Sequence, residues 1–250
     1  MISNKLSGKW VLFFWLFLTG LAALAYYLYN KPRFVRYPGF GIEIPVNYSI
    51  HGIDVSHYQK RVDWEEVRAM QIKNINIGFC FMKATEGTDR TDDMFKRNWG
   101  GAKANYIPRG AYHFFNPAKS GILQAKHFIR QVRLEKGDLP PVLDIEQING
   151  ENVTDLQQRL SDWLIEVEKK YGVKPIIYTN VGFYKSYLSG KFDDYPLWVA
   201  HYLIKNKPRI KRDWIFWQHN ESGNVNGIDA YVDFNVFSGS AEEFEQLRLK

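Results

Sequence analysis

The chain is nearly free of cysteine and lacks the short motifs of several large enzyme classes. Cys80 is the single cysteine among 250 residues, so no disulfide forms within the chain, and its neighbours INIGFCFM predict a buried small side chain. No G-x-G-x-x-G or Walker sequence follows an apolar run, which argues against dinucleotide and nucleoside triphosphate chemistry. G-x-S-x-G and H-E-x-x-H are also absent. We therefore expect neither a serine-hydrolase elbow nor a common zinc site, and no cofactor.

A strong charge of one sign is missing as well. The net charge is +6, but Lys5, Lys9 and Lys31 lie in the first 31 residues, where there are no acids, which leaves +3 for the remainder. This mild excess favours an anionic polymer or a membrane surface as partner. A nucleic-acid binder would need a concentrated basic stripe with interleaved aromatics, so we expect no nucleic-acid partner.

The N-terminal segment contains a long apolar run. Residues 10–29 (WVLFFWLFLTGLAALAYYLY) carry no charge over 20 positions, which is long enough for a helix to cross a bilayer. An A-x-A pattern at 23–25 also fits a processing site, so a cleaved signal sequence is the alternative. We prefer an uncleaved anchor, because the apolar run continues through three tyrosines beyond that pattern. The flanking charges do not decide its orientation.

The rest of the chain, 45% hydrophobic and without repeats or low-complexity tracts, suits one domain. Eight short apolar runs predict strands, at 50–56, 75–85, 109–115, 141–146, 175–180, 196–202, 214–220 and 228–237. Helical patterns separate the early runs, at 62–71, 92–106, 119–136 and 155–172. Strand-then-helix units imply a parallel sheet, and eight runs favour a closed barrel over an open doubly wound sheet. Because connections shorten after residue 175, we expect fewer than eight helices.

The expected division of the chain is a basic tail at 1–9, the anchor at 10–29, a connector at 30–48 and the barrel at 49–250. One strand-like run, PPVLDIEQ at 140–147, ends in Asp144 and Glu146. Residues two apart on a strand share a face, so these carboxylates repel each other when ionised, which raises the pKa of one of them. A raised pKa is what a general acid needs near neutral pH. The alternative is a strand end that has simply reached solvent.

Other polar side chains follow the ends of several predicted strands. Asp54, Gln218 and Asp233 lie there, and in a barrel such ends meet at one rim. Aromatic side chains near the same ends are suited to stacking on sugar rings, unless they face outward into the core. These aromatics are Tyr112, Tyr178, Trp198, Tyr202 and Trp217. Lys83, Glu86, His113 and His201 fit a structural role as well as a catalytic one. A metal site built on Asp54 and His57 is a weaker alternative.

Seven motifs, in order along the chain, resemble glycoside hydrolase family 25, the lysozymes of Chalaropsis type. They are GIDVSHYQ at 52–59, FMKATEG at 81–87, GAYHFF at 110–115, PVLDIE at 141–146, IYTN at 177–180, LWVAHY at 197–202 and the WQH…GIDAYVDFNVF tail at 217–237. The resemblance implies an α/β fold, a modified TIM-like β/α barrel with eight strands and fewer than eight helices, here preceded by one transmembrane helix. It also implies hydrolysis of the β-1,4 bond between N-acetylmuramic acid and N-acetylglucosamine.

Carried over to this sequence, the resemblance makes Glu146 the general acid and places Asp144, Asp54 and Asp233 beside it as catalytic carboxylates. Tyr112, Tyr178, Trp198 and Gln218 are then expected to bind the glycan. The nucleophile is either a carboxylate or the 2-acetamido oxygen of the substrate itself, and we favour the second, with retention.

The resemblance also implies peptidoglycan strands as the partner of a monomer. The barrel must then lie outside the cytoplasm, on a single-pass anchor or secreted after cleavage. Competing readings are a catalytically silent glycan-binding barrel and a hydrolase of a chitin-like glycan.

Overall fold

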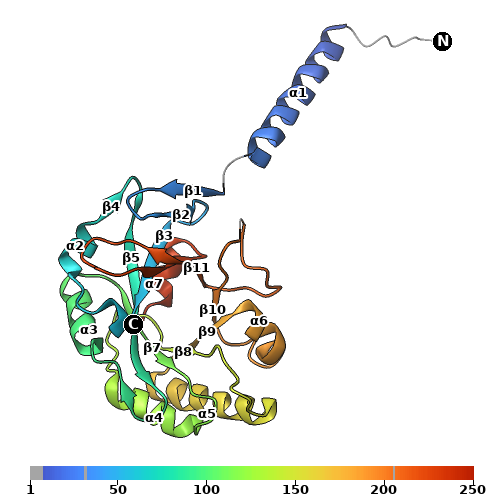
Figure 1. The fold of residues 1–250 in the computed structure, drawn as a ribbon. Coiled ribbons are helices and arrows are strands. Elements are labelled where there is room, and N and C mark those ends of the chain that lie inside the picture. The colour runs from blue at the N-terminus through green and yellow to red at the C-terminus, as the bar shows by residue number, and fades with distance from the viewer. Residues whose placement is uncertain (1–7, 31–32, 205) are drawn as a thin grey trace.

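Eight strands close into a barrel in the computed structural model, which describes residues 8–30, 33–204 and 206–250 (Figure 1). The strands are β3 (Ile50–Val55), β5 (Ile75–Glu86), β7 (Arg109–Phe114), β8 (Val142–Asp144), β9 (Ile176–Asn180), β10 (Leu197–Ala200), β11 (Phe216–Gly223) and β12 (Val232–Phe237). Their spatial order is β3-β12-β11-β10-β9-β8-β7-β5, and β5 pairs back onto β3. The closed barrel expected from the sequence is confirmed, and the open sheet is excluded.

One strand runs against the others. Seven strands are parallel, but β12 pairs antiparallel with both β11 and β3. The uniformly parallel sheet inferred from strand-then-helix units was therefore wrong at β12. The physical reason is the short connection at 224–231, because a parallel crossover needs about a dozen residues or more.

The helices cover the outside of the early part of the barrel. They are α2 (Trp64–Ala69), α3 (Phe95–Ala104), α4 (Gly121–Gln131) and α5 (Val153–Tyr171), followed by the short α6 (Val181–Phe183) and the π-helical turn η2 (Tyr184–Leu188). Minor elements are the 3-10 turn η1 (His57–Gln59), β4 (Gln71–Ile72) and β6 (Arg90–Thr91). Side chains of Asp63, Ser120 and Asn152 cap the starts of α2, α4 and α5. The four expected helices are confirmed, and later connections are short, as predicted.

Aromatic rings fill the barrel, and a C-terminal helix closes one end. Alternate residues of β5, β10, β11 and β12 point inward and form a buried cluster with Phe79, Phe81, Trp198, Phe216 and Phe237. Helix α7 (Ala241–Leu247) adds Phe244, whose ring centroid lies 5.7 Å from that of Phe79 and 5.2 Å from that of Phe237. This plug lies where the parallel strands begin. A ligand must therefore enter at the opposite rim, where those strands end.

The segment expected to be a connector contains a β-hairpin, β1 (Phe34–Tyr37) paired antiparallel with β2 (Ile42–Pro45). Its side chains pack on the outside of the barrel. The ring centroids of Phe40 and Phe234 are 5.2 Å apart, and Ile42 and Ile44 are buried. Residues 34–45 thus belong to the packed body of the protein and are not a free linker.

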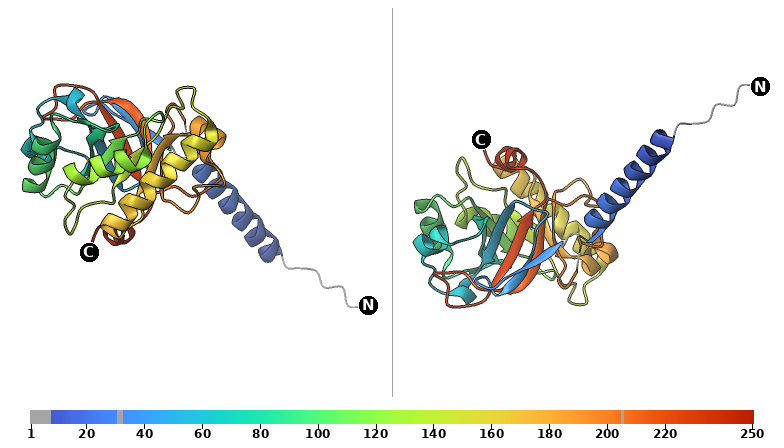
Figure 2. Two further views of the ribbon diagram at one scale, coloured as in Figure 1. Left: turned by 90° about the horizontal axis from the view of Figure 1, so that it is seen from below. Right: turned by 90° about the horizontal axis from the view of Figure 1, so that it is seen from above.

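Helix α1 (Gly8–Asn30) extends away from the barrel (Figures 1 and 2). The stretch Lys9–Tyr26 is long and apolar enough to cross a membrane, and none of it is buried within the protein. Such a helix is consistent with a signal sequence or an anchor. The expected basic tail falls largely outside the described residues, as does Lys31.

Candidate active site

A pocket of about 380 Å³ opens at the rim where the parallel strands end. All eight site residues predicted from the sequence line it, namely Asp54, Tyr112, Asp144, Glu146, Tyr178, Trp198, Gln218 and Asp233. The further lining residues include Tyr58, Gln59, Lys83, Phe114, Tyr202 and Glu221. Strands that are distant in sequence thus deliver four carboxyls to one hollow.

Asp54 and Asp233 face each other across the antiparallel pairing of β3 with β12. Burial raises the pKa of Asp54 to about 6, although hydrogen bonds from Asn235, Gln218 and Asp233 oppose the shift. Burial, reinforced by the charge of Asp54, raises the pKa of Asp233 to about 9. These shifts favour an ionised Asp54 that accepts a hydrogen bond from a protonated Asp233 near neutral pH.

Two buried amides hold the carboxylate of Asp54. Its Oδ2 accepts hydrogen bonds from Gln218 Nε2 at 2.8 Å and from Asn235 Nδ2 at 2.7 Å. Each amide is fixed in turn by an aromatic donor, because Trp198 Nε1 donates to Asn235 Oδ1 at 2.8 Å and Tyr178 OH donates to Gln218 Oε1 at 2.7 Å. These bonds set both amide orientations and leave Asp54 with a fixed direction into the pocket.

The aromatic side chains of the pocket differ in what they offer a ligand. Trp198 is 2% exposed and stacks on Phe81 with ring centroids 4.6 Å apart, so its main contribution is to hold Asn235. Tyr202 also donates its hydroxyl to Gln218 Oε1 and is only partly buried. Tyr112 is likewise partly buried, whereas Tyr58 is 73% exposed. The more open rings at the pocket mouth are therefore those of Tyr58, Tyr112 and Tyr202.

Asp144 and Glu146 lie on one side of β8 and its continuation, with Ile145 buried on the other side. Burial raises the pKa of Asp144 well above its usual value, the charge of Glu146 adds to this, and Lys83 opposes it. Burial, followed by the charge of Asp54, also raises the pKa of Glu146. Asp144 is 6% exposed, so the alternative of a strand end that has simply reached solvent is wrong.

Lys83 is the one basic side chain among the described residues that line this pocket. Its amine lies 2.7 Å from Glu86 Oε2 and 4.7 Å from the ring centroid of Phe114. Arg90 holds the other oxygen of Glu86 at 2.6 Å. One lysine cannot neutralise four clustered carboxyls, and the cluster therefore retains protons at neutral pH.

Several polar residues that the sequence placed at strand ends lie elsewhere or serve the scaffold. His113 is fully buried, with ring nitrogens 2.7 Å from Thr85 Oγ1 and 3.1 Å from Gln124 Oε1. Trp217 faces outward and donates to the carbonyl of His201. His57 pairs with Asp92 at 2.8 Å, and the described part of the chain contains no group of three or more His, Cys, Asp or Glu side chains arranged to hold a metal.

Sequence reasoning missed several pocket residues. Tyr58 and Gln59 lie in η1, inside the GIDVSHYQ motif, so their proximity to Asp54 was a usable signal. Asn235, which lies beneath the pocket and bonds to Asp54, is inside VDFN next to Asp233 and carried the same kind of signal. Glu221 had no such signal. Irregular pairing of β11 with β12 after Gln218 breaks the alternation of faces that would otherwise place it.

With this geometry established, comparison with known proteins identifies the family. The model of glycosyl hydrolases family 25 matches residues 53–228. The chain belongs to this family. Its sequence is 46% identical over 206 residues to the protein named "Uncharacterized protein YegX" of Escherichia coli strain K12, covering 82% of this chain and 76% of that protein. It is 34% identical over 207 residues to Lysozyme M1 of Streptomyces globisporus, covering 77% and 69% respectively.

Solved structures of the family share the barrel. A family 25 glycosyl hydrolase from Bacillus anthracis superposes with a TM-score of 0.75 at 35% identity, covering 85% of this chain and 99% of that one. A bacterial lysozyme from Streptomyces coelicolor gives a TM-score of 0.71 at 32% identity, covering 80% and 96%. The resemblance noted from the motifs is thus confirmed for family and fold, and the reaction of this chain follows as a proposal.

Proposed function

We propose that this protein is a retaining muramidase that cleaves the β-1,4 bond between N-acetylmuramic acid and N-acetylglucosamine in peptidoglycan. One observation carries the proposal: Asp54, Asp144, Glu146 and Asp233 line a single pocket whose mouth also presents tyrosine rings. Glycoside hydrolysis needs a proton donor for the leaving oxygen and a negative group to stabilise the developing positive charge on the sugar. The named relatives that are lysozymes support the same reaction.

Glu146 is the general acid in this scheme. Its pKa is raised, and it is more exposed than Asp144, so its proton faces the pocket. Asp144 Oδ1 is buried and has no hydrogen-bond partner among the described residues, so it is available to accept a hydrogen bond from the substrate. Ionised Asp54 supplies the negative charge near the reacting sugar.

The 2-acetamido group of the substrate is the proposed nucleophile: its oxygen attacks the anomeric carbon as the glycosidic bond breaks, and Asp144 accepts a hydrogen bond from its N–H. Water then opens the resulting oxazolinium ion, with the deprotonated Glu146 taking the proton from that water. This assignment rests on the acid-x-acid spacing at 144–146, which places Asp144 beside the proton donor. Tyr112, Tyr178, Trp198 and Gln218 shape the pocket that orients the ring. No cofactor enters the scheme.

Helix α1 serves as a single-pass membrane anchor in this proposal, with the barrel outside the cytoplasm, where peptidoglycan lies. The alternative is a secreted barrel released by cleavage at the A-x-A pattern. In either case, we propose a monomer whose partner is the glycan strand and not a nucleic acid.

The deciding experiment is digestion of purified peptidoglycan, followed by mass spectrometry of the released reducing ends. Reducing N-acetylmuramic acid supports a muramidase, chitin-oligosaccharide cleavage supports the chitin-like alternative, and binding without product supports a silent barrel. Glu146→Gln is the matched variant, because the amide has the same shape but donates no acidic proton. Its turnover should fall at least about 10²-fold while glycan binding and thermal stability persist. Near wild-type turnover in this variant would remove Glu146 from the assigned role.

A further inference from the structure

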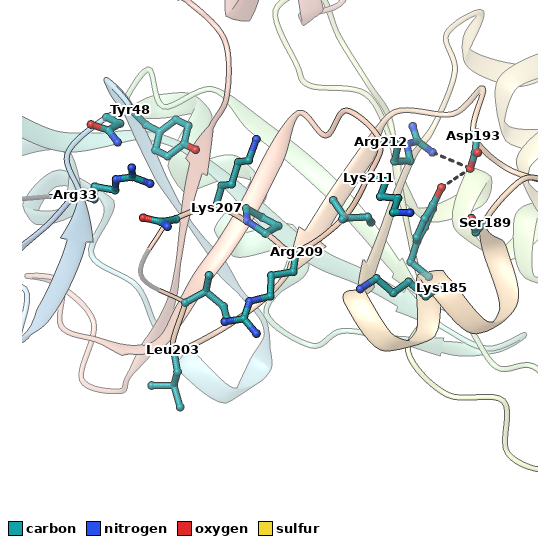
Figure 3. Close-up of a pocket in the computed structure, with 16 residues that line it drawn as sticks. Arg33, Tyr48, Lys185, Ser189, Asp193, Leu203, Lys207, Arg209, Lys211 and Arg212 are labelled. Carbon is teal, nitrogen blue, oxygen red and sulfur yellow. Dashed lines mark hydrogen bonds and ion pairs between the residues drawn. The ribbon is translucent and has the colours of Figure 1, made fainter. Parts of the chain in front are cut away.

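A second pocket, larger than the active-site pocket, lies elsewhere on the protein. It has a volume of about 1110 Å³ and lies between residues that flank the β1–β2 hairpin, the η2 turn and the described parts of the β10–β11 connection, 201–204 and 206–215 (Figure 3). It shares no lining residue with the active-site pocket. A ligand bound here would leave the carboxyl cluster open to the glycan.

Basic side chains dominate this second pocket. The described lining residues include Arg33, Lys185, Lys207, Arg209, Lys211 and Arg212, and Asp193 is the one acid among them. Arg212 lies 3.7 Å from Asp193, and in the described part of the chain no acid lies within ion-pairing distance of the other five cations. Figure 3 shows these cations coming from both walls, from the hairpin side, the helical side and the loop between them. Such a pocket attracts anionic groups large enough to contact several of these cations at once.

Two of these cations affect the pKa of a neighbouring histidine, His201. Arg209 donates its backbone N–H to His201 Nδ1 at 3.1 Å, and burial followed by the charges of Arg209 and Lys185 lowers the pKa of His201. These cations come from separate elements, yet they act on one group. Arg209 and Lys185 thus lie close enough to His201 for both charges to act on it.

The pocket begins next to the proposed membrane anchor. Helix α1 ends at Asn30, and Arg33 lines the pocket three residues later, a separation of at most about 11 Å for an extended chain. At the same pocket, Leu203 is 97% exposed, with a left-handed backbone φ of 56° that non-glycine residues adopt infrequently. An exposed leucine beside a ring of cations suits the boundary between lipid headgroups and acyl chains.

We propose that this basic pocket binds the headgroups of anionic phospholipids in the membrane that α1 enters, and so fixes the barrel against the bilayer surface. The inference rests on the proposed anchorage by α1, but not on the proposed reaction. Charge complementarity and the short tether favour lipid phosphates over other anions, because the tether keeps the pocket within reach of the bilayer surface. Held in this way, the barrel would act on glycan strands close to the membrane.

The test uses the full-length protein in nanodiscs of phosphatidylcholine, with and without phosphatidylglycerol, and measures amide hydrogen exchange. Exchange in the β10–β11 connection should slow at least about tenfold when anionic lipid is present, since each basic side chain near an anionic surface strengthens binding about fivefold. Lys207→Glu combined with Arg209→Glu should abolish the slowing, and the corresponding pair of glutamine substitutions should weaken it. Lys96→Glu combined with Lys126→Glu makes the same charge change on the exposed faces of α3 and α4 and should leave it intact.

The outcomes separate this inference from the others. Co-elution with neutral nanodiscs reports insertion of α1, and hydrolysis of soluble glycan fragments reports the reaction, which should be unchanged in all of these variants. Equal exchange in neutral and anionic nanodiscs would overturn the lipid assignment. It would also be overturned if inorganic phosphate or soluble peptidoglycan fragments, added to neutral nanodiscs, produced the same slowing.

Discussion

Asn235 offers the sharpest test of the hydrogen-bond arrangement beneath the active site. It is fully buried, accepts from Trp198 and donates to Asp54 at 2.7 Å. Asn235→Asp preserves the shape of the side chain and its hydrogen bond from Trp198, but it places a second carboxyl next to the ionised carboxylate of Asp54. The introduced carboxyl keeps contact with Asp54 only if one of the two carries a proton. Folding of the variant therefore takes up a proton that the wild type does not need.

The magnitude follows from that proton. An aspartate in the unfolded chain has a pKa of about 3.9, and holding it protonated in the folded protein costs about 1.4 kcal/mol for each pH unit above that value. At pH 7 the cost is about 4 kcal/mol. Because the folded-state pKa is raised, the penalty is absent below the unfolded pKa and grows as pH rises. At pH 4 it is close to zero.

Urea unfolding of wild type and Asn235→Asp at several pH values between 4 and 7 measures this difference. Asn152→Asp is the matched control, since Asn152 caps α5 and aspartate caps a helix equally well, so its stability should stay within about 0.5 kcal/mol throughout. If Asn235→Asp is as stable as wild type at pH 7, or if its deficit does not shrink toward pH 4, the proposed charge state of Asp54 is wrong.

Three further predictions concern the reaction, the barrel plug and the anchor. Asp144→Asn should slow hydrolysis of N-acetylated glycan about 10²-fold or more but have little further effect on hydrolysis of de-N-acetylated glycan. Asp233→Asn should slow hydrolysis of both substrates alike, and a trapped covalent glycosyl ester would contradict the acetamido route. Phe244→Ala should lower the unfolding free energy by about 3–5 kcal/mol in urea titrations with turnover near wild type, against less than about 1 kcal/mol for exposed Ile165→Ala. Full-length protein should resist salt extraction from membranes and need detergent, and recovery of a soluble form beginning at Tyr26 would show processing instead.

Much of the barrel was predictable because its strands are short, apolar and separated by clear helical patterns. The position of Asp144 and Glu146 on one face followed from strand alternation alone, and the buried Ile145 between them bears this out. The hairpin within the expected connector could not be predicted, for a physical reason. Its sequence is basic and contains proline and glycine, yet Phe40, Ile42 and Ile44 bury themselves against the barrel, which only tertiary packing decides.

The pKa pattern of the site was only partly within reach of the sequence. Repulsion between Asp144 and Glu146 predicted that one carboxyl would keep a proton. Burial, which is the first cause of the pKa shift at every carboxyl in the cluster, depends on tertiary packing and could not be predicted from local patterns. The hydrogen bonds that the amides of Gln218 and Asn235 make to Asp54 could not be predicted from the sequence either. Their bonds to Asp54 join residues 164 and 181 positions apart, and no local pattern encodes such a pairing.

The reversed direction of β12 is what completes the candidate site. Asp233 is the second residue of this strand, so in a parallel strand it would lie near the end of the barrel that Phe244 closes. Running antiparallel, β12 instead places Asp233 opposite Asp54 at the open rim and Phe237 beside the plug. The same reversal brings Asn235 between Asp54 and Trp198. A short connection at 224–231 thus determines strand direction, and strand direction determines which carboxyl holds the proton next to Asp54.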